Sequence, residues 1–387
     1  MATATLPTSR PPRDVANSGP HERVLAHAAQ RHAAQRHAAH GHGMLAAFPR
    51  LMSSIAYELA RCHVCGGADT DEVADAEEVR AEVEALWEFH TRRVAGATPP
   101  EKLLDRAAFS EPPPVRVVRC RACGLVYRNP QERPQELAEI YEADAGVGDD
   151  VLAALLETQR RSYRAQARRL TRIAGGVGTG LEVGSYVGAF LDAARRMGWR
   201  FEGVDVNEGA SRFARSKGFA VTIGTIDDVP ATRRFDAVAV WNCLDQLPDP
   251  RHVIMRARAM LSPKGVVAVR VPNGEAYARW REAAEHGAAA PLARAVLAHN
   301  NLLTFPYRFG FTLRSLRRLL RDAGLEVVHV EGDTLVPIAD EHTKRWARVE
   351  ERALKGALRL FRTLHLTPVT ASPWLEVYAR SGARGQA

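Results

Sequence analysis

Residues 180–191 read GLEVGSYVGAFL, and this stretch decides the fold. It predicts an apolar strand, a glycine-containing turn and the first turn of a helix, in that order. Parallel α/β sheets use such a turn to point backbone N–H groups at a ligand. A second strand is predicted over 201–206, and its Asp205 lies about 20 residues after Gly184, where such folds place the acid that binds a ribose. The sequence therefore predicts an α/β protein with a nucleoside-containing cofactor.

The spacing of the glycines separates two classes of cofactor. Dinucleotide-binding turns carry G-x-G-x-x-G, whereas here three other residues separate Gly184 from Gly188, and Glu182 precedes them. This order fits nicotinamide cofactors poorly. It resembles motif I of the class I S-adenosylmethionine-dependent methyltransferases, written (D/E)-x-G-x-G-x-G. The resemblance implies that S-adenosylmethionine is bound by Glu182, Gly184, Gly188 and Asp205. Tyr186 replaces the middle glycine, so its ring either redirects the turn or lies over the cofactor.

The rest of the C-terminal part predicts further alternating elements. Strands are expected over 220–223, 235–240, 266–271, 325–330 and 374–380, and helices over 150–173, 208–217, 275–298, 312–323 and 341–364. In the family that motif I resembles, the last strand is antiparallel. The resemblance thus implies a Rossmann-like, seven-stranded methyltransferase sheet that is otherwise parallel.

Two loops are assigned to the cofactor by resemblance. Residues 224–228 follow the third strand and border the adenine in the family, which assigns Ile226 and Asp227 to cofactor binding. Thr225 stands where the family usually has an acid. The second loop begins at Trp241, which is also assigned to the cofactor.

This second loop, residues 241–250, reads WNCLDQLPDP and resembles the family sequence W-x-x-L-E-H-L-P-D-P. Asp245 and Gln246 replace the Glu-His pair. An amide can form hydrogen bonds but cannot take up a proton, so position 246 is excluded as a general base. Cys243 in the same loop is interpreted as a buried packing residue.

Four of the five cysteines form two C-x-x-C pairs, each followed by glycine, at Cys62, Cys65, Cys120 and Cys123. Four thiolates make a closed tetrahedral site, so we expect structural zinc. The pairs are much farther apart than in an ordinary zinc ribbon, and a helix predicted within 70–95 bridges them. A disulfide needs an oxidising compartment that nothing in the sequence indicates, and a rubredoxin-like iron or iron–sulfur site stays an alternative.

The segment after the second pair, residues 123–130, reads CGLVYRNP. It resembles bacterial class I methyltransferases that carry an N-terminal zinc knuckle, and residues 136–141 resemble the linker that follows in them. The chain is accordingly divided into a disordered His/Ala/Arg-rich tail (1–50), a zinc-ribbon-like domain with a helical insert (51–135) and a methyltransferase domain (136–387). A substrate-lid insertion is expected around 275–312.

Charge and hydropathy exclude several other classes. The net charge is +8, but the tail alone carries six arginines against two acidic residues. The remaining basic residues are neither clustered nor interleaved with aromatic ones, so nucleic acid is not expected as a partner. No apolar run reaches about 18 residues, and the N-terminus lacks the apolar core of a signal peptide. We expect a cytoplasmic protein with no membrane partner.

The expected function is methyl transfer from S-adenosylmethionine to a small-molecule acceptor. Relatives with zinc knuckles act on nucleotide-linked sugars or other secondary metabolites, which implies such an acceptor here. His299 and Tyr307, in the variable region, are the candidates for catalytic contact with it. The alternative is a zinc-ribbon module that binds nucleic acid or protein and has a degenerate methyltransferase fold. No motif determines the methylated atom or the oligomeric state.

Overall fold

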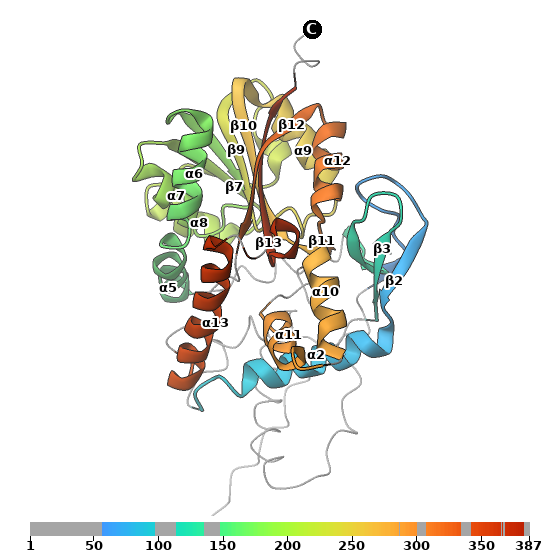
Figure 1. Ribbon diagram of the computed structural model, residues 1–387. Coiled ribbons are helices and arrows are strands. Elements are labelled where there is room, and N and C mark those ends of the chain that lie inside the picture. The colour runs from blue at the N-terminus through green and yellow to red at the C-terminus, as the bar shows by residue number, and fades with distance from the viewer. Residues whose placement is uncertain are drawn as a thin grey trace, which may run out of the picture.

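The computed structural model describes residues 56–96, 114–134, 148–285, 287–299, 307–333, 342–364, 366 and 368–382 (Figure 1). The predicted tail and the predicted linker at 136–141 lie outside these residues. Among the described residues, no helix is long and apolar enough to cross a membrane.

A seven-stranded sheet forms the centre of the C-terminal part, with the order β12-β13-β10-β9-β6-β7-β8. Its strands are β6 (Thr179–Val183), β7 (Arg200–Asp205), β8 (Val221–Ile223), β9 (Phe235–Trp241), β10 (Leu261–Pro272), β12 (Leu325–Asp333) and β13 (Trp374–Ser381). The pairs among β8, β7, β6, β9 and β10 are parallel, whereas β13 runs antiparallel to both β10 and β12. The predicted sheet with its antiparallel last strand is therefore confirmed.

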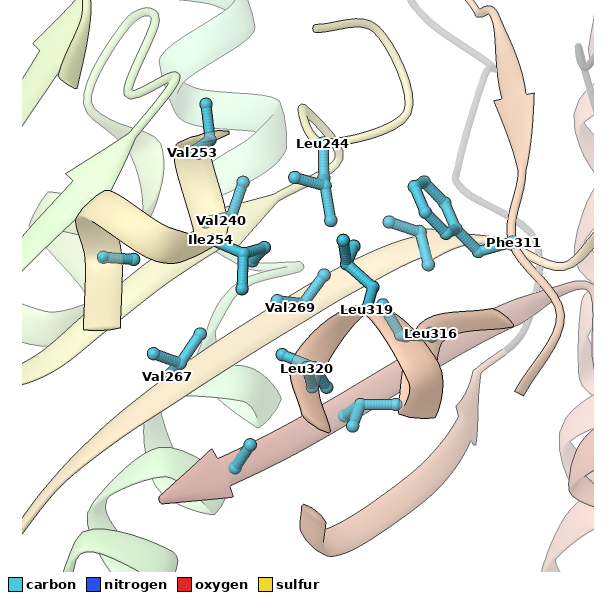
Figure 2. Packing of buried hydrophobic residues seen from close by; sticks show 14 of the residues in the cluster. Val240, Leu244, Val253, Ile254, Val267, Val269, Phe311, Leu316, Leu319 and Leu320 are labelled. Atoms are coloured by element: carbon cyan, nitrogen blue, oxygen red, sulfur yellow. The ribbon is translucent and has the colours of Figure 1, made fainter. Parts of the chain in front are cut away.

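Helices cover both faces of this sheet (Figure 1). On one side lie α6 (Arg164–Ala174), α7 (Ala189–Arg195) and α8 (Glu208–Ser216); on the other lie α9 (Pro250–Ala259) and α12 (Leu313–Asp322). Strand β9 shows why both faces need cover, because Val238 and Val240 belong to one apolar cluster while Ala237 and Ala239 belong to another. Figure 2 shows Val240 packing with Ile254 of α9 and with the leucines of α12.

Two helices expected to be continuous are each broken in two. The expected helix over 150–173 consists of α5 (Asp149–Arg160) and α6, and that over 275–298 consists of α10 (Gly274–Glu285) and α11 (Ala290–Leu297). In the second case Gly287 has a φ of 92°, and Pro291 lies in the first turn of α11. In the first case Tyr163 lies at the break and its ring packs on Phe190, a tertiary contact that helix periodicity does not reveal.

The N-terminal part is built on a four-stranded sheet with the order β11-β4-β3-β2. The strands are β2 (Thr70–Ala74), β3 (Arg116–Cys120), β4 (Val126–Asn129) and β11 (Phe309–Gly310), and β1 (Tyr57–Glu58) pairs separately with β5 (Gln131–Glu132). The predicted bridging helix is α2 (Ala76–Thr91), and Asp75 and Glu78 form a capping box at its start. Strand β11 belongs to the expected lid region, yet it pairs with β4.

The remaining elements are the short 3-10 helices η4 (Ile226–Asp228) and η5 (Val369–Ala371) and the long helix α13 (Arg345–Thr363). Helices α2, α10, α11 and α13 lie below the end of the sheet at which its parallel strands finish (Figure 1). These helices therefore lie on the side where a parallel α/β sheet binds its ligand.

Candidate active site and metal centre

The turn between β6 and α7 adopts the backbone that its glycines permit. Gly184 and Gly188 have φ values of 76° and 78°, and Tyr186 between them has a φ of 43°. Gly184 also lies against the β9 loop, because a Cβ added there would approach the Sγ of Cys243 to 2.5 Å. The backbone at Tyr186 thus follows a redirected turn. Its side chain packs beside Leu152, Val187 and Phe213.

Replacing Gly184 by alanine is expected to destabilise the fold by about 1–3 kcal/mol, because the new Cβ meets both a positive φ and the Cys243 sulfur. Thermal melting would measure the loss. Gly175 is the matched control, since its φ is 84° but nothing lies within 4 Å of its added Cβ. Equal losses for the two variants would contradict a role for the contact with Cys243.

Asp205, at the end of β7, holds this turn in place. Its Oδ2 accepts a hydrogen bond of 2.7 Å from the backbone N–H of Tyr186, and its Oδ1 accepts one of 2.8 Å from that of Asn207. Burial raises the pKa of Asp205, while these two donors act in the opposite direction. Each oxygen retains acceptor capacity, because an ionised carboxylate offers about four lone-pair sites.

Glu182 lies beneath the turn on β6, and only 2% of it is exposed. Its Oε2 has no hydrogen-bond partner in the described part of the chain. Burial, together with the charge of Asp205, raises the pKa of Glu182 well above its ordinary value. Burial and the neighbouring acids Asp205, Asp245 and Glu182 likewise raise the pKa of the Cys243 thiol. A group of acidic side chains therefore gathers around Cys243.

Asp245 completes this group and is fully buried. Neither of its carboxylate oxygens has a hydrogen-bond partner among the described residues. Burial raises its pKa to about 7, and its own backbone N–H together with Arg270 only partly opposes this shift. Its backbone carbonyl accepts hydrogen bonds from the N–H groups of Arg308 at 2.9 Å and Phe309 at 3.1 Å. Sequence reasoning considered position 246 but missed Asp245, although an acid in the loop that follows an apolar central strand was a usable signal.

The Asp245→Asn variant is expected to be more stable than the wild type at pH 8. The folded-state pKa of about 7 exceeds the ordinary 3.8, so stability that is present below about pH 4 is lost as the pH rises through 7. Asparagine avoids this loss, which amounts to at most about 4 kcal/mol. Denaturant unfolding between pH 4 and pH 8 would measure it. A difference in stability that does not change with pH would contradict the buried, ionisable carboxyl.

The four cysteines of the two C-x-x-C pairs meet in one cluster. The Sγ atoms of Cys62, Cys65, Cys120 and Cys123 all lie within 4.8 Å of one another. The two knuckles have the same geometry, because Gly66 donates to the carbonyl of Cys62 and Gly124 donates to that of Cys120, both at 2.7 Å. Four thiol ligands this close together fit a tetrahedral zinc ion. The structure thus brings together the cysteines that the sequence predicted to act together.

Residues 155–330 match the family model described as a methyltransferase domain, and the sheet order given above is that of class I. Residues 155–330 are thereby identified as a methyltransferase domain. Solved methyltransferase structures are also similar to it, at low identity. A SAM-dependent methyltransferase from Archaeoglobus fulgidus is 18% identical, with a TM-score of 0.38, over 57% of this chain and 93% of that one. The CcbJ methyltransferase from Streptomyces caelestis is 16% identical, with a TM-score of 0.38, over 57% of this chain and 90% of that one. No curated protein matches the sequence.

The residues at the end of the methyltransferase sheet fit its methyl donor. S-adenosylmethionine carries positive charge on its sulfonium and amino groups, whereas Glu182 is a buried acid whose Oε2 has no partner among the described residues. A cation placed beside Glu182 would offset the cost of its burial. Asp205 keeps free acceptor capacity for hydroxyl groups, and a side chain at Gly184 would fill space against the β9 loop. The donor set and the narrow turn therefore suit a cationic nucleoside.

Other residues that the sequence assigned to the cofactor have partners within the methyltransferase fold. The indole of Trp241 is buried among Phe190 and Tyr378, with ring centroids 5.2 and 6.3 Å away. Ile226 is 2% exposed and lies in the core. Asp227 accepts from His252 Nε2 and pairs with Arg256 Nε, both at 2.8 Å. Contact of these three with the adenine stays a prediction.

Gln246 also has a structural partner, because its Nε2 donates to the carbonyl of Asn242 at 2.7 Å. Asn242 has a φ of 53°, and its Nδ2 donates to the hydroxyl of Tyr163 at 3.1 Å. These linked hydrogen bonds fix the start of the loop that carries Asp245. The amide at position 246 thus supports the loop geometry.

The two predicted catalytic residues lie in different surroundings. His299 is buried, and the centroid of its ring lies 5.3 Å from that of Phe89. Burial, together with the charges of Lys355 and Arg93, lowers the pKa of His299 to about 3. Such a neutral imidazole is a weak base at neutral pH. Tyr307 directly precedes the residues that hold the Asp245 carbonyl, and its ring lies 6.5 Å from that of Trp374. Their catalytic contact with an acceptor stays a prediction.

Proposed function

We propose that this methyltransferase transfers the methyl group of S-adenosylmethionine to a small-molecule acceptor, with a nucleotide-linked sugar or another secondary metabolite as the acceptor class. The observation that carries the proposal is Asp245, a fully buried carboxyl whose oxygens lack partners in the described part of the chain. A buried group can act only on an acceptor that enters the protein. This favours a small molecule over the surface of a macromolecule.

The cofactor is held by the turn and by the acids around it. Asp205 would accept hydrogen bonds from the ribose hydroxyls, while its own contacts with Tyr186 and Asn207 keep the turn in position. Glu182 lies beneath the turn and supplies negative charge for the positive donor. The bound donor supplies a methyl group on a sulfonium, which is already activated for transfer. The protein then mainly has to align the acceptor atom with this carbon and exclude water.

Asp245 is the base in this proposal. With a pKa of about 7 it is partly ionised at neutral pH, and it can take the proton that an acceptor hydroxyl or carbon acid loses as its bond to the methyl carbon forms. Position 246 cannot do so, because glutamine does not take up a proton. Tyr307 and His299 are retained as candidate acceptor contacts, the latter as a hydrogen-bonding group.

The other parts of the chain support this assignment. We propose that residues 51–135 form a zinc-binding region on a methyltransferase domain of residues 136–387, with the residues around 275–312 covering the acceptor. Zinc in the Cys62, Cys65, Cys120 and Cys123 cluster would be structural, because four thiolates leave no open position. A reducing compartment is required to keep these thiols free, which supports a cytoplasmic location.

Calorimetric titration of the zinc-loaded full chain with S-adenosylmethionine and with S-adenosylhomocysteine tests the proposal. Micromolar binding of both is expected, followed by methyl transfer when nucleotide-linked sugars are screened with labelled donor. Absence of cofactor binding, together with salt-sensitive binding of DNA or RNA, would support the degenerate zinc-ribbon module instead. Cofactor binding with transfer only to protein or nucleic acid would overturn the small-molecule acceptor.

A further inference from the structure

The cysteine cluster lies against strand β11, which comes from the C-terminal half of the chain. Phe309 of β11 pairs with Tyr127 of β4, and Gly310 pairs with Val126. The ring of His63, which lies between the first two cysteines, packs against that of Phe309 in a tilted arrangement, with centroids 4.9 Å apart. In the sheet β4 lies between β11 and β3, and Figure 1 shows β11 above α10. On one side, therefore, β11 contacts the region that carries the four cysteines.

The other partner of this segment is the loop that carries Asp245. The backbone N–H groups of Arg308 and Phe309 both donate to the carbonyl of Asp245, at 2.9 and 3.1 Å. The guanidinium of Arg308, which is 3% exposed, donates to Gln131 Oε1 at 2.6 Å and to the carbonyl of Glu132 at 3.2 Å. Two adjacent residues thus connect the N-terminal region directly to Asp245.

Apolar packing makes the same connection. Leu244, next to Asp245, belongs to one continuous cluster that also contains Phe309, Phe311, Cys62 and Cys123. Figure 2 shows Leu244 close to Phe311 and to the leucines of α12. Helix α12 is also tied to the second knuckle, since Arg314 Nη2 donates to the carbonyl of Ala122 at 3.0 Å. The cysteine cluster and the Asp245 loop therefore share a rigid set of neighbours.

We propose that the four-cysteine cluster, with its metal bound, positions Asp245 through residues Arg308 and Phe309, so that loss of the metal lowers methyl transfer without lowering cofactor affinity. The inference rests on the proposed role of Asp245. Asp205 and Gly184, which are proposed to bind the cofactor, make their contacts at the ends of β6, β7 and β9, away from β11. A small displacement of the carboxyl is sufficient, because a shift of about 1 Å can reduce a rate by about a hundredfold.

The test compares the zinc-loaded wild type with the Cys65→Ser variant, since Cys65 is the least buried of the four cysteines. Zinc content, cofactor Kd, kcat and hydrogen exchange of single amides are measured on each. In the variant we expect faster exchange at Arg308 and Phe309, a fall in kcat of about tenfold or more, and a cofactor Kd within about twofold. The amide of Gly184, bonded to Val204, is the internal control for exchange.

Arg314→Ala keeps all four cysteines and removes only the contact with Ala122, so it replaces Cys65→Ser if that variant does not fold. Its matched control is Arg318→Ala on the same helix, where the arginine pairs with Asp322. Faster exchange at Arg308 and Phe309 is expected in the first variant only, with kcat lowered about twofold to fivefold.

The outcomes separate this inference from the proposed function. If metal-free, folded protein shows unchanged amide exchange at Arg308 and Phe309 and an unchanged kcat, the metal does not position Asp245. The proposed function of the enzyme would still stand. A parallel loss of cofactor affinity would also overturn the positioning role, because the metal would then support the whole site. Full activity of an Asp245→Asn variant would instead overturn the proposed base and, with it, the basis of the inference.

Discussion

The Asp245→Asn variant is expected to lose about a hundredfold or more in kcat, while its Kd for S-adenosylmethionine stays within about threefold. Asparagine has nearly the same shape and leaves the backbone bonds from Arg308 and Phe309 intact, but it cannot take up a proton. Steady-state kinetics with the identified acceptor and calorimetry with the cofactor measure the two quantities separately. This separation distinguishes loss of a base from loss of the binding site.

The pH dependence follows from the same carboxyl. Its pKa of about 7 means that it is protonated, and inactive as a base, below this pH. In the wild type kcat/KM is therefore expected to rise with pH and to level off above about pH 8, and in Asp245→Asn this rise is absent.

Asp249→Asn is the matched control for this experiment. Asp249 lies in the same loop, is exposed, and caps α9 by accepting from the N–H of His252 at 2.9 Å. Asparagine caps helices about as well as aspartate, so kinetics and stability should stay near those of the wild type. If Asp249→Asn and Asp245→Asn lose activity equally, the loss reflects the loop and not the proposed base.

The second large effect is expected at Asp205. The Asp205→Asn variant should bind S-adenosylmethionine about 10- to 100-fold more weakly, because hydrogen bonds to a charged acceptor contribute about 1.5–3 kcal/mol. The carboxylate accepts from two backbone N–H groups, those of Tyr186 and Asn207, whereas an amide offers a single acceptor oxygen. One of these donors then loses its partner and the turn loosens. Calorimetric titration measures the change.

A carboxylate at the opposite end of the parallel strands, where they begin, provides the control. Asp236, at the start of β9, accepts from the N–H of Thr179 at 2.9 Å and from the hydroxyl of Ser262 at 3.0 Å. The Asp236→Asn variant should lose some stability yet keep its cofactor Kd within about twofold, because its contacts lie at the amino ends of the strands. Equal losses of affinity in both variants would show that Asp205 acts through stability alone.

Features carried by neighbouring residues could be predicted from the sequence. The strand, turn and helix around Gly184 and the position of Asp205 at a strand end agree with the structure. The antiparallel last strand, which the family resemblance implied, agrees as well. The two C-x-x-C pairs could be grouped because thiol ligands recur at fixed local spacing, even though Cys65 and Cys120 are far apart in the chain. Residues 97–113 between these pairs lie outside the described residues.

Features that depend on contacts between distant segments could not be predicted in this way. Helix periodicity did not reveal the break at Tyr163, which a ring contact with Phe190 accompanies. The pKa of Asp245 depends on burial by surrounding elements, and the amides that hold it come from Arg308 and Phe309. Strand β11 has only two residues, too few to show a period, and its partner β4 follows the second pair of cysteines.

The amino-acid pattern therefore predicted the class of fold, the turn at Gly184 and the grouping of the four cysteines, because each is encoded by residues at short, regular spacing. The tertiary structure alone placed Asp245 in a closed, apolar setting and connected it to the cysteine cluster. The physical reason is that desolvation and strand pairing act between surfaces that only the folded chain brings together, and no local pattern of residues records them.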